Sequence, residues 1–194
     1  MRNTLICNLI LFLAYFIPGK LGFLLALPPD NFTAIWPSSG FASAGVILLG
    51  YKSLPGVFLG SLVLNLNQQL SIAEIFSPAI VSHMTTYGFI ALGAFCESLT
   101  VAYIVRRFIG FPSAFSHWRD AFILFLGAGL VGAIPSPTIS VTMFYIKGYI
   151  ALSGYLYSWF WWWIGNSLGI IAITPILVTL FSPKKILVTN EKYI

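Results

Sequence analysis

Charge is scarce in this sequence. Only 8% of the 194 residues are Asp, Glu, Lys or Arg, whereas roughly 25% of the residues in an ordinary soluble domain are charged. Hydrophobic residues make up 58% of the chain. Because one core of this size cannot bury so much apolar surface, the composition excludes a water-soluble domain and indicates a protein that sits in a lipid bilayer.

Residues that carry catalysis or bind metals are also few. Cys7 and Cys96 lie in separate apolar segments, so the sequence predicts neither a disulfide framework nor a zinc site. His83 and His117 have no second His or carboxylate at the spacing of a metal site or catalytic triad. The sequence contains no phosphate-binding glycine loop and no nucleophile elbow. We therefore expect no enzymatic activity, no metal and no cofactor in this chain.

Long apolar runs, in contrast, are abundant. They cover residues 5–27, 33–50, 54–70, 75–108, 121–146 and 149–181. Since about 20 apolar residues cross a bilayer as a helix, we expect an all-α transmembrane bundle of about six spans in residues 1–181, with Pro135 and Pro137 interrupting the fifth. Residues 182–194 then form a short cytoplasmic tail or the start of a linker to an absent output module.

The basic residues predict the orientation of these spans. The net charge is +5, but the Lys and Arg side chains are dispersed among the loops, which argues against a nucleic-acid partner. Short loops rich in Lys and Arg stay on the cytoplasmic side. With both termini in the cytoplasm, only Lys147 among the loop cations lies outside. The cytoplasmic cations are then Arg2, Lys52, Arg106, Arg107, Arg119, Lys184, Lys185 and Lys192.

Two charged side chains fall inside the spans, where a charge costs about 2.5 to 3.5 kcal/mol. Lys20 lies in the first span, and Glu97 lies in the fourth, roughly 15 Å from the Arg106 end at 1.5 Å per residue. We expect both to line an interior polar cavity that binds a ligand or carries the signal. A structural ion pair is the alternative, and Lys20 also has the length to reach the outer headgroups.

Three further residues are candidates for the same cavity. Asn166 lies midway along the sixth span and needs a hydrogen-bond partner there. Trp36 precedes Pro37 in a segment that predicts irregular backbone near the outer surface, which suits a cavity rim or a kinked helix start. Trp163 is expected in the cavity, although interfacial anchoring is an alternative for the tryptophans around it.

Gly165 and Gly169 form a G-x-x-x-G face on the sixth span. Glycines at this spacing let two helix backbones approach closely. The face therefore predicts either packing within the bundle or a homodimer, and the sequence leaves both open.

Five short runs, taken together, resemble the membrane-associated sensor (MASE) domain of the first type. The first three cover residues 19–29, 33–40 and 54–60. The fourth begins at Glu97 and ends at Arg107. The fifth runs from Trp162 through Asn166 to Pro175.

The resemblance implies a bacterial inner-membrane sensory domain that reports to a cytoplasmic output. The output partner implied is a histidine kinase, a diguanylate cyclase or a phosphodiesterase module. A signal acts on such a domain through different affinities for two states of the bundle. A small-molecule transporter or substrate-capture subunit also fits a six-helix bundle with polar groups at mid-depth, and a purely structural membrane partner is the third alternative.

Overall fold

The computed structural model describes residues 3–25, 33–69, 77–111 and 117–182, and all regular structure within them is helical. Residues 26–32, which precede the second expected span, and residues 183–194 of the expected tail lie outside this part of the chain. The helices follow the order α1 (Thr4–Leu24), α2 (Pro37–Leu49), a 3-10 turn (Tyr51–Ser53), α3 (Leu54–Gln69), α5 (Ala79–Ile104) with a π-helical end (Val105–Ile109), α6 (Trp118–Phe122), a π-helical stretch (Ile123–Val131), α7 (Pro135–Ile146) and α8 (Leu152–Phe181).

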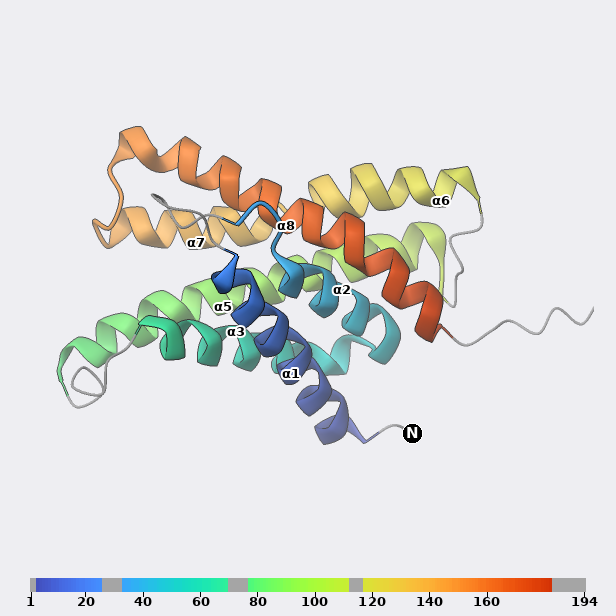
Figure 1. Ribbon diagram of the computed structural model, residues 1–194, viewed down its shortest axis with the longest axis horizontal. Helices are drawn as coiled ribbons and strands as arrows, with labels where there is room; N and C mark the ends of the chain where they lie inside the picture. Colours follow the sequence, from blue (N-terminus) through green and yellow to red (C-terminus); the bar gives the residue numbers. More distant parts are fainter. Residues whose placement is uncertain (1–2, 26–32, 70–76, 112–116, 183–194) are drawn as a thin grey trace, which may run out of the picture.

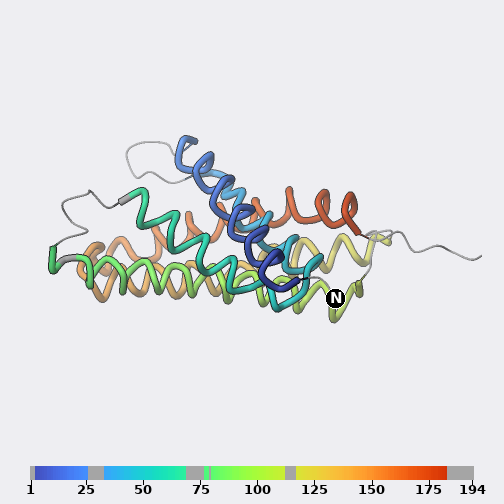
Figure 2. Tube along the Cα trace, turned by 90° about the horizontal axis from the view of Figure 1, so that it is seen from below, coloured from blue at the N-terminus to red at the C-terminus, as the bar shows by residue number. Residues whose placement is uncertain are grey.

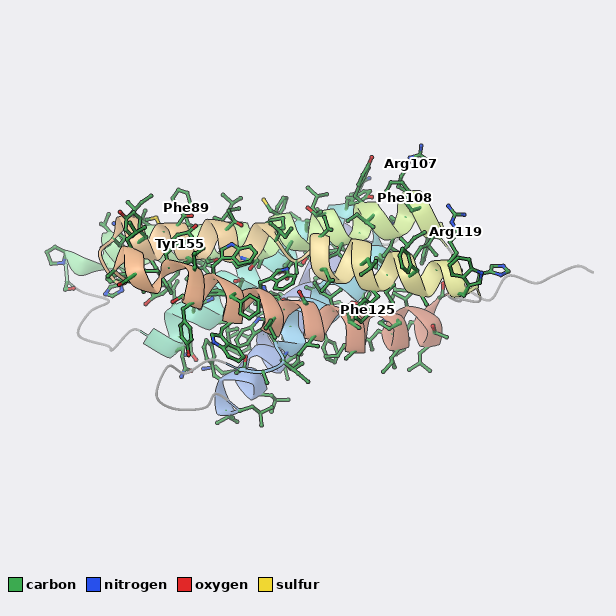
Figure 3. All side chains as sticks on the ribbon, turned by 90° about the horizontal axis from the view of Figure 1, so that it is seen from above. Phe89, Arg107, Phe108, Arg119, Phe125 and Tyr155 are labelled. Carbon is green, nitrogen blue, oxygen red and sulfur yellow. The ribbon has the colours of Figure 1, made fainter. Side chains whose placement is uncertain are left out.

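The helices form an elongated bundle (Figure 1). The start of α1, the turn between α2 and α3, the end of α5 and the end of α8 share one end, which we call the terminal end. Arg107 and Arg119 lie at this end (Figure 3). The α7–α8 connection, with Lys147, lies at the other, distal end. In the perpendicular view α1 lies across α3, and α5 runs beside α7 (Figure 2).

Four helical segments are long and apolar enough to cross a bilayer. They are Thr4–Leu24, Ile80–Ile109, Trp118–Ile146 and Leu152–Phe181. At 1.5 Å per residue, α2 with 13 residues is about 20 Å long and α3 with 16 residues is about 24 Å, below the roughly 30 Å of a hydrocarbon core. The expected all-helical, multi-pass membrane fold is confirmed, and six crossings with both termini inside stay a prediction.

The break in the fifth apolar run falls where the sequence predicts it. Helical structure stops after Val131 and resumes at Pro135. The Ile134 N–H bonds to the Val131 carbonyl, and Pro135 has no N–H to donate. The Leu130 carbonyl therefore lacks a backbone donor, and the indole Nε1 of Trp163 bonds to it at 2.8 Å instead.

The second apolar run begins with extended backbone, and this explains why α2 is short. Trp36 has φ −100° and ψ 95°, and Pro37 opens the helix. The Trp36 N–H donates to the Gly165 carbonyl at 2.8 Å. Irregular backbone at membrane depth must be covered by protein, and here α8 covers it.

The G-x-x-x-G face of α8 makes this cover. A Cβ added at Gly169 would lie 2.1 Å from the Trp36 carbonyl oxygen, and one at Gly165 would lie 2.9 Å from the Thr33 carbonyl oxygen. Both glycines therefore pack against the backbone of the segment before α2 in the same chain. This corrects the alternative of a homodimer through that face, because a second copy cannot reach backbone that Trp36 and Thr33 already contact.

Candidate functional site

A carboxyl–amide pair lies in the middle of the bundle. The side chains of Glu97 on α5 and Asn166 on α8 are 1% and 2% exposed. Asn166 Nδ2 donates to Glu97 Oε2 at 2.6 Å. The Ser39 side chain on α2 lies beside the same Glu97 carboxyl group. A buried polar group in lipid is tolerated when it is hydrogen-bonded, so this cluster joins three helices around one carboxyl group.

The beginning of α2 favours a negative charge at this place. A helix N-terminus carries partial positive charge from its unpaired N–H groups. The first turn of α2 contains no acidic residue of its own. The Ser38 hydroxyl in this first turn donates a hydrogen bond to the Tyr15 carbonyl at 2.7 Å, which joins the turn to α1. Glu97 thus supplies from α5 the acidic group that complements the start of α2.

A cavity of about 490 Å³ adjoins the cluster. Its walls come from α1, α3, α5, α7, α8 and the extended segment before α2, and many of them lie in the distal half of the helices or in the α7–α8 connection. The lining residues are Tyr15, Phe23, Thr33, Trp36, Asn65, His83, Tyr87, Ile90, Ser136, Phe144, Tyr149, Trp161, Trp162, Gly165 and Asn166. A volume of this size suits a small-molecule site.

The structure brings together three of the five predicted site residues. Trp36 and Asn166 line the cavity. Glu97 lies directly behind the lining, where its hydrogen bond from Asn166 holds that amide. The predicted interior polar cavity is therefore present, with Glu97 as a support for its wall.

The other two predicted residues lie elsewhere, which corrects the expectation that all five line one cavity. The buried face of α1 includes Tyr15, Gly19 and Gly22, whereas Lys20 is partly exposed and its Nζ lies 5.7 Å from the Phe16 ring centroid. The alternative of an ion pair between Lys20 and Glu97 is not formed. The Trp163 indole N–H donates a hydrogen bond to the Leu130 carbonyl, which stabilises the helix break. Trp163 does not line the cavity.

Several lining residues were missed by the sequence reasoning, although a helical pattern could have indicated them. His83, Tyr87 and Ile90 line the cavity, and Glu97 follows on the same face of α5 at helical spacing. On α8, Trp162 and Asn166 are four residues apart. His83 was considered only as a metal or triad residue, and Asn65 was not selected as a candidate. Tracing the helical faces of Glu97 and Asn166 would have found His83, Tyr87, Ile90 and Trp162.

The terminal end of α2 is also tied to α5. The Arg106 guanidinium donates a hydrogen bond to the Ile47 carbonyl in the last turn of α2. The same guanidinium lies 5.4 Å from the Tyr51 ring centroid and 5.0 Å from that of Phe111. Therefore α2 contacts α5 through Ser39 and Glu97 at its start and through Ile47 and Arg106 at its end.

A comparison with family models matches residues 7–185 to MASE1. The chain belongs to the MASE1 family. MASE1 is a membrane-associated sensory domain, so the chain is a multi-pass membrane protein with a sensory role. The match covers the whole cavity lining together with Glu97 and Arg106. No curated protein and no solved structure matches the chain.

We expect Asn166→Leu in this MASE1 chain to destabilise it more than the double substitution Glu97→Leu with Asn166→Leu. The single change leaves a buried carboxyl group without its amide donor, which costs about 1 to 3 kcal/mol, whereas the double change removes both polar partners. Thermal unfolding of the purified chain in maltoside micelles measures the difference. Equal melting temperatures for the single and double variants would contradict a stabilising Glu97–Asn166 bond.

Proposed function

We propose that this MASE1 domain detects a small molecule in the cavity next to Glu97 and transmits its binding to a cytoplasmic output at the terminal end. The observation that supports this most directly is the position of α2. Its first turn adjoins the cavity through Trp36, and its last turn is held by Arg106 near the opposite end of the bundle. A single short helix thus connects a ligand-sized space with the surface where an output module would attach.

The proposed orientation has six crossings with both termini inside, in a bacterial inner membrane. Lys52, Arg106, Arg107 and Arg119 belong to turns or helix ends at the terminal end, and cytoplasmic loops collect such residues. Arg2, Lys184, Lys185 and Lys192 lie outside the described residues. In this orientation the cavity faces the non-cytoplasmic side, because Phe23, Thr33 and Tyr149 of its lining lie near distal helix ends.

Signal transfer in this proposal depends on the two contacts between α2 and α5. A ligand shifts a conformational equilibrium only if it binds one state better than the other. A ligand that moves Trp36 or the Asn166 amide changes the support of the Glu97 carboxyl group, and α2 carries that change to Ile47 and Arg106. A histidine kinase, diguanylate cyclase or phosphodiesterase module following α8 would read the shift. If this chain forms a homodimer, its interface lies on a face other than the one formed by Gly165 and Gly169.

A second candidate function is substrate capture for a transporter. Transporter sites often place the N-terminus of a broken helix beside a polar site near mid-depth, and the start of α2 beside Glu97 has this arrangement. A capture subunit would support uptake together with an energising partner, whereas a sensor changes the activity of an output module. Uptake lost in a Glu97→Gln strain, with unchanged signalling, would favour the transporter.

The orientation predicts which loops a membrane-impermeant maleimide reaches. In a background with Cys7→Ala and Cys96→Ala, we expect Ala151→Cys to react in intact cells and Lys52→Cys to react only in inverted vesicles. Both positions are exposed, so accessibility from each side decides the result. Reaction of Lys52→Cys in intact cells, or from neither side, would contradict six crossings with both termini inside.

The sensory role is tested by fusing a diguanylate cyclase module after residue 194 and measuring cyclic-di-GMP in cells. We expect Glu97→Gln and Arg106→Gln each to change the output by about fivefold or more, the lower range of allosteric coupling, at unchanged membrane levels. Phe89→Leu is the matched control, because Phe89 is an exposed side chain on α5 (Figure 3). Wild-type output in both variants would contradict the proposed signal route.

A further inference from the structure

The described residues that line the cavity share an unusual chemistry. Eight of the fifteen are aromatic, and none is Asp, Glu, Lys or Arg. The aromatic set is Tyr15, Phe23, Trp36, Tyr87, Phe144, Tyr149, Trp161 and Trp162. Ring faces carry negative potential and attract cations, and Trp does so most strongly. With no Lys or Arg in this lining, an anionic ligand would find no permanently charged cation there.

The two amides in the lining favour ligands that donate hydrogen bonds. Asn65 Nδ2 donates to the Ser61 carbonyl at 2.8 Å, and Asn166 Nδ2 donates to Glu97 Oε2 at 2.6 Å. Each amide thus has an N–H group committed to the protein, and among the described residues neither Oδ1 atom accepts a hydrogen bond. An amide held by its nitrogen leaves its oxygen as the free acceptor.

A carboxyl group behind this wall reinforces the preference. Glu97 lies behind Asn166, which donates a hydrogen bond to it, and the Ser39 side chain lies beside the same carboxyl group. A cation bound in the cavity would favour the ionised form of this carboxyl group. Lys20, a cation that could have neutralised Glu97, lies against Phe16 instead. A positive ligand charge in the cavity would therefore face aromatic rings and amide oxygens, with the Glu97 carboxyl group behind them.

From these observations we infer that the cavity binds a small organic cation, a protonated or quaternary amine with an apolar or aromatic body. This inference rests on the proposed ligand-sensing function and names the ligand class for the same site. The cationic head is attracted to the wall in front of Glu97, and the apolar body fills the aromatic walls formed by Trp161, Trp162 and Phe144. The entry side is the distal end.

The test compares two probes of the same shape and different charge, benzyltrimethylammonium and neopentylbenzene. The full chain is purified in maltoside micelles, whose headgroups are uncharged, and binding is followed by quenching of tryptophan fluorescence. We expect saturable binding of benzyltrimethylammonium to the wild type. Glu97→Gln should weaken it about tenfold or more and leave neopentylbenzene binding unchanged, because Gln cannot ionise beside the bound cation and preserves the shape of the side chain.

Two tryptophan variants provide the matched comparison. Trp162→Leu removes a ring from the cavity wall and should weaken binding of the cation about tenfold, whereas Trp118→Leu removes a ring that is 83% exposed at the start of α6 and should leave binding unchanged. Melting temperatures and elution profiles identify any variant that is misfolded. If Trp162→Leu is misfolded, Tyr149→Leu takes its place, because Tyr149 also lines the cavity and lies in the exposed α7–α8 connection.

The outcomes separate this inference from the proposed function. Equal affinity for the uncharged probe, with the same dependence on Trp162, would overturn the cationic ligand class and leave a ligand-binding cavity. Absence of saturable binding by either probe would also overturn the cationic class. The proposed sensory function would fail separately, through unchanged output of the Glu97→Gln and Arg106→Gln fusions.

Discussion

The hydrogen bond between the Glu97 carboxyl group and the Asn166 amide is the interaction on which the interior of this bundle depends. Lipid offers these groups no alternative partner, so α5 and α8 must place them together. Ser39 adds the first turn of α2 to the same carboxyl group. The position of that turn then fixes Trp36, which lines the cavity. One polar contact therefore sets the positions of three helices and of one cavity wall.

Backbone contact makes this arrangement sterically feasible. Gly165 and Gly169 allow the extended segment around Trp36 to lie directly on α8, and side chains at either position would collide with backbone carbonyl oxygens. The same closeness lets the Trp36 N–H find an acceptor in the Gly165 carbonyl. As a result, α2 begins deep in the bundle and is short, and its other end reaches Arg106. The feature that creates a cavity also creates a direct link to the terminal end.

Much of the fold could be predicted from apolar runs and helix breakers, because lipid imposes helices on such runs and Pro135 removes a hydrogen-bond donor. Glu97 and Asn166 could be selected because polar groups are costly there. Their contact with each other and with Ser39 could not be predicted, since the three residues lie far apart in sequence. The cavity positions expected for Lys20 and Trp163 were wrong because a sequence does not show which face of a helix is covered. Lys20 lies against Phe16, and Trp163 bonds to the Leu130 carbonyl, which has no backbone donor. His83 and Tyr87 were within reach through helical spacing.

The central claim is that the space beside Glu97 and Asn166 is a ligand site whose occupancy depends on the carboxyl group. Native mass spectrometry of the purified wild-type chain and of its Glu97→Gln variant tests it most directly. The account predicts that a small molecule copurifies with the wild type and is absent from the variant, and its mass would identify its chemistry. Ligand-free spectra for both proteins, or the same bound species in both, would contradict it.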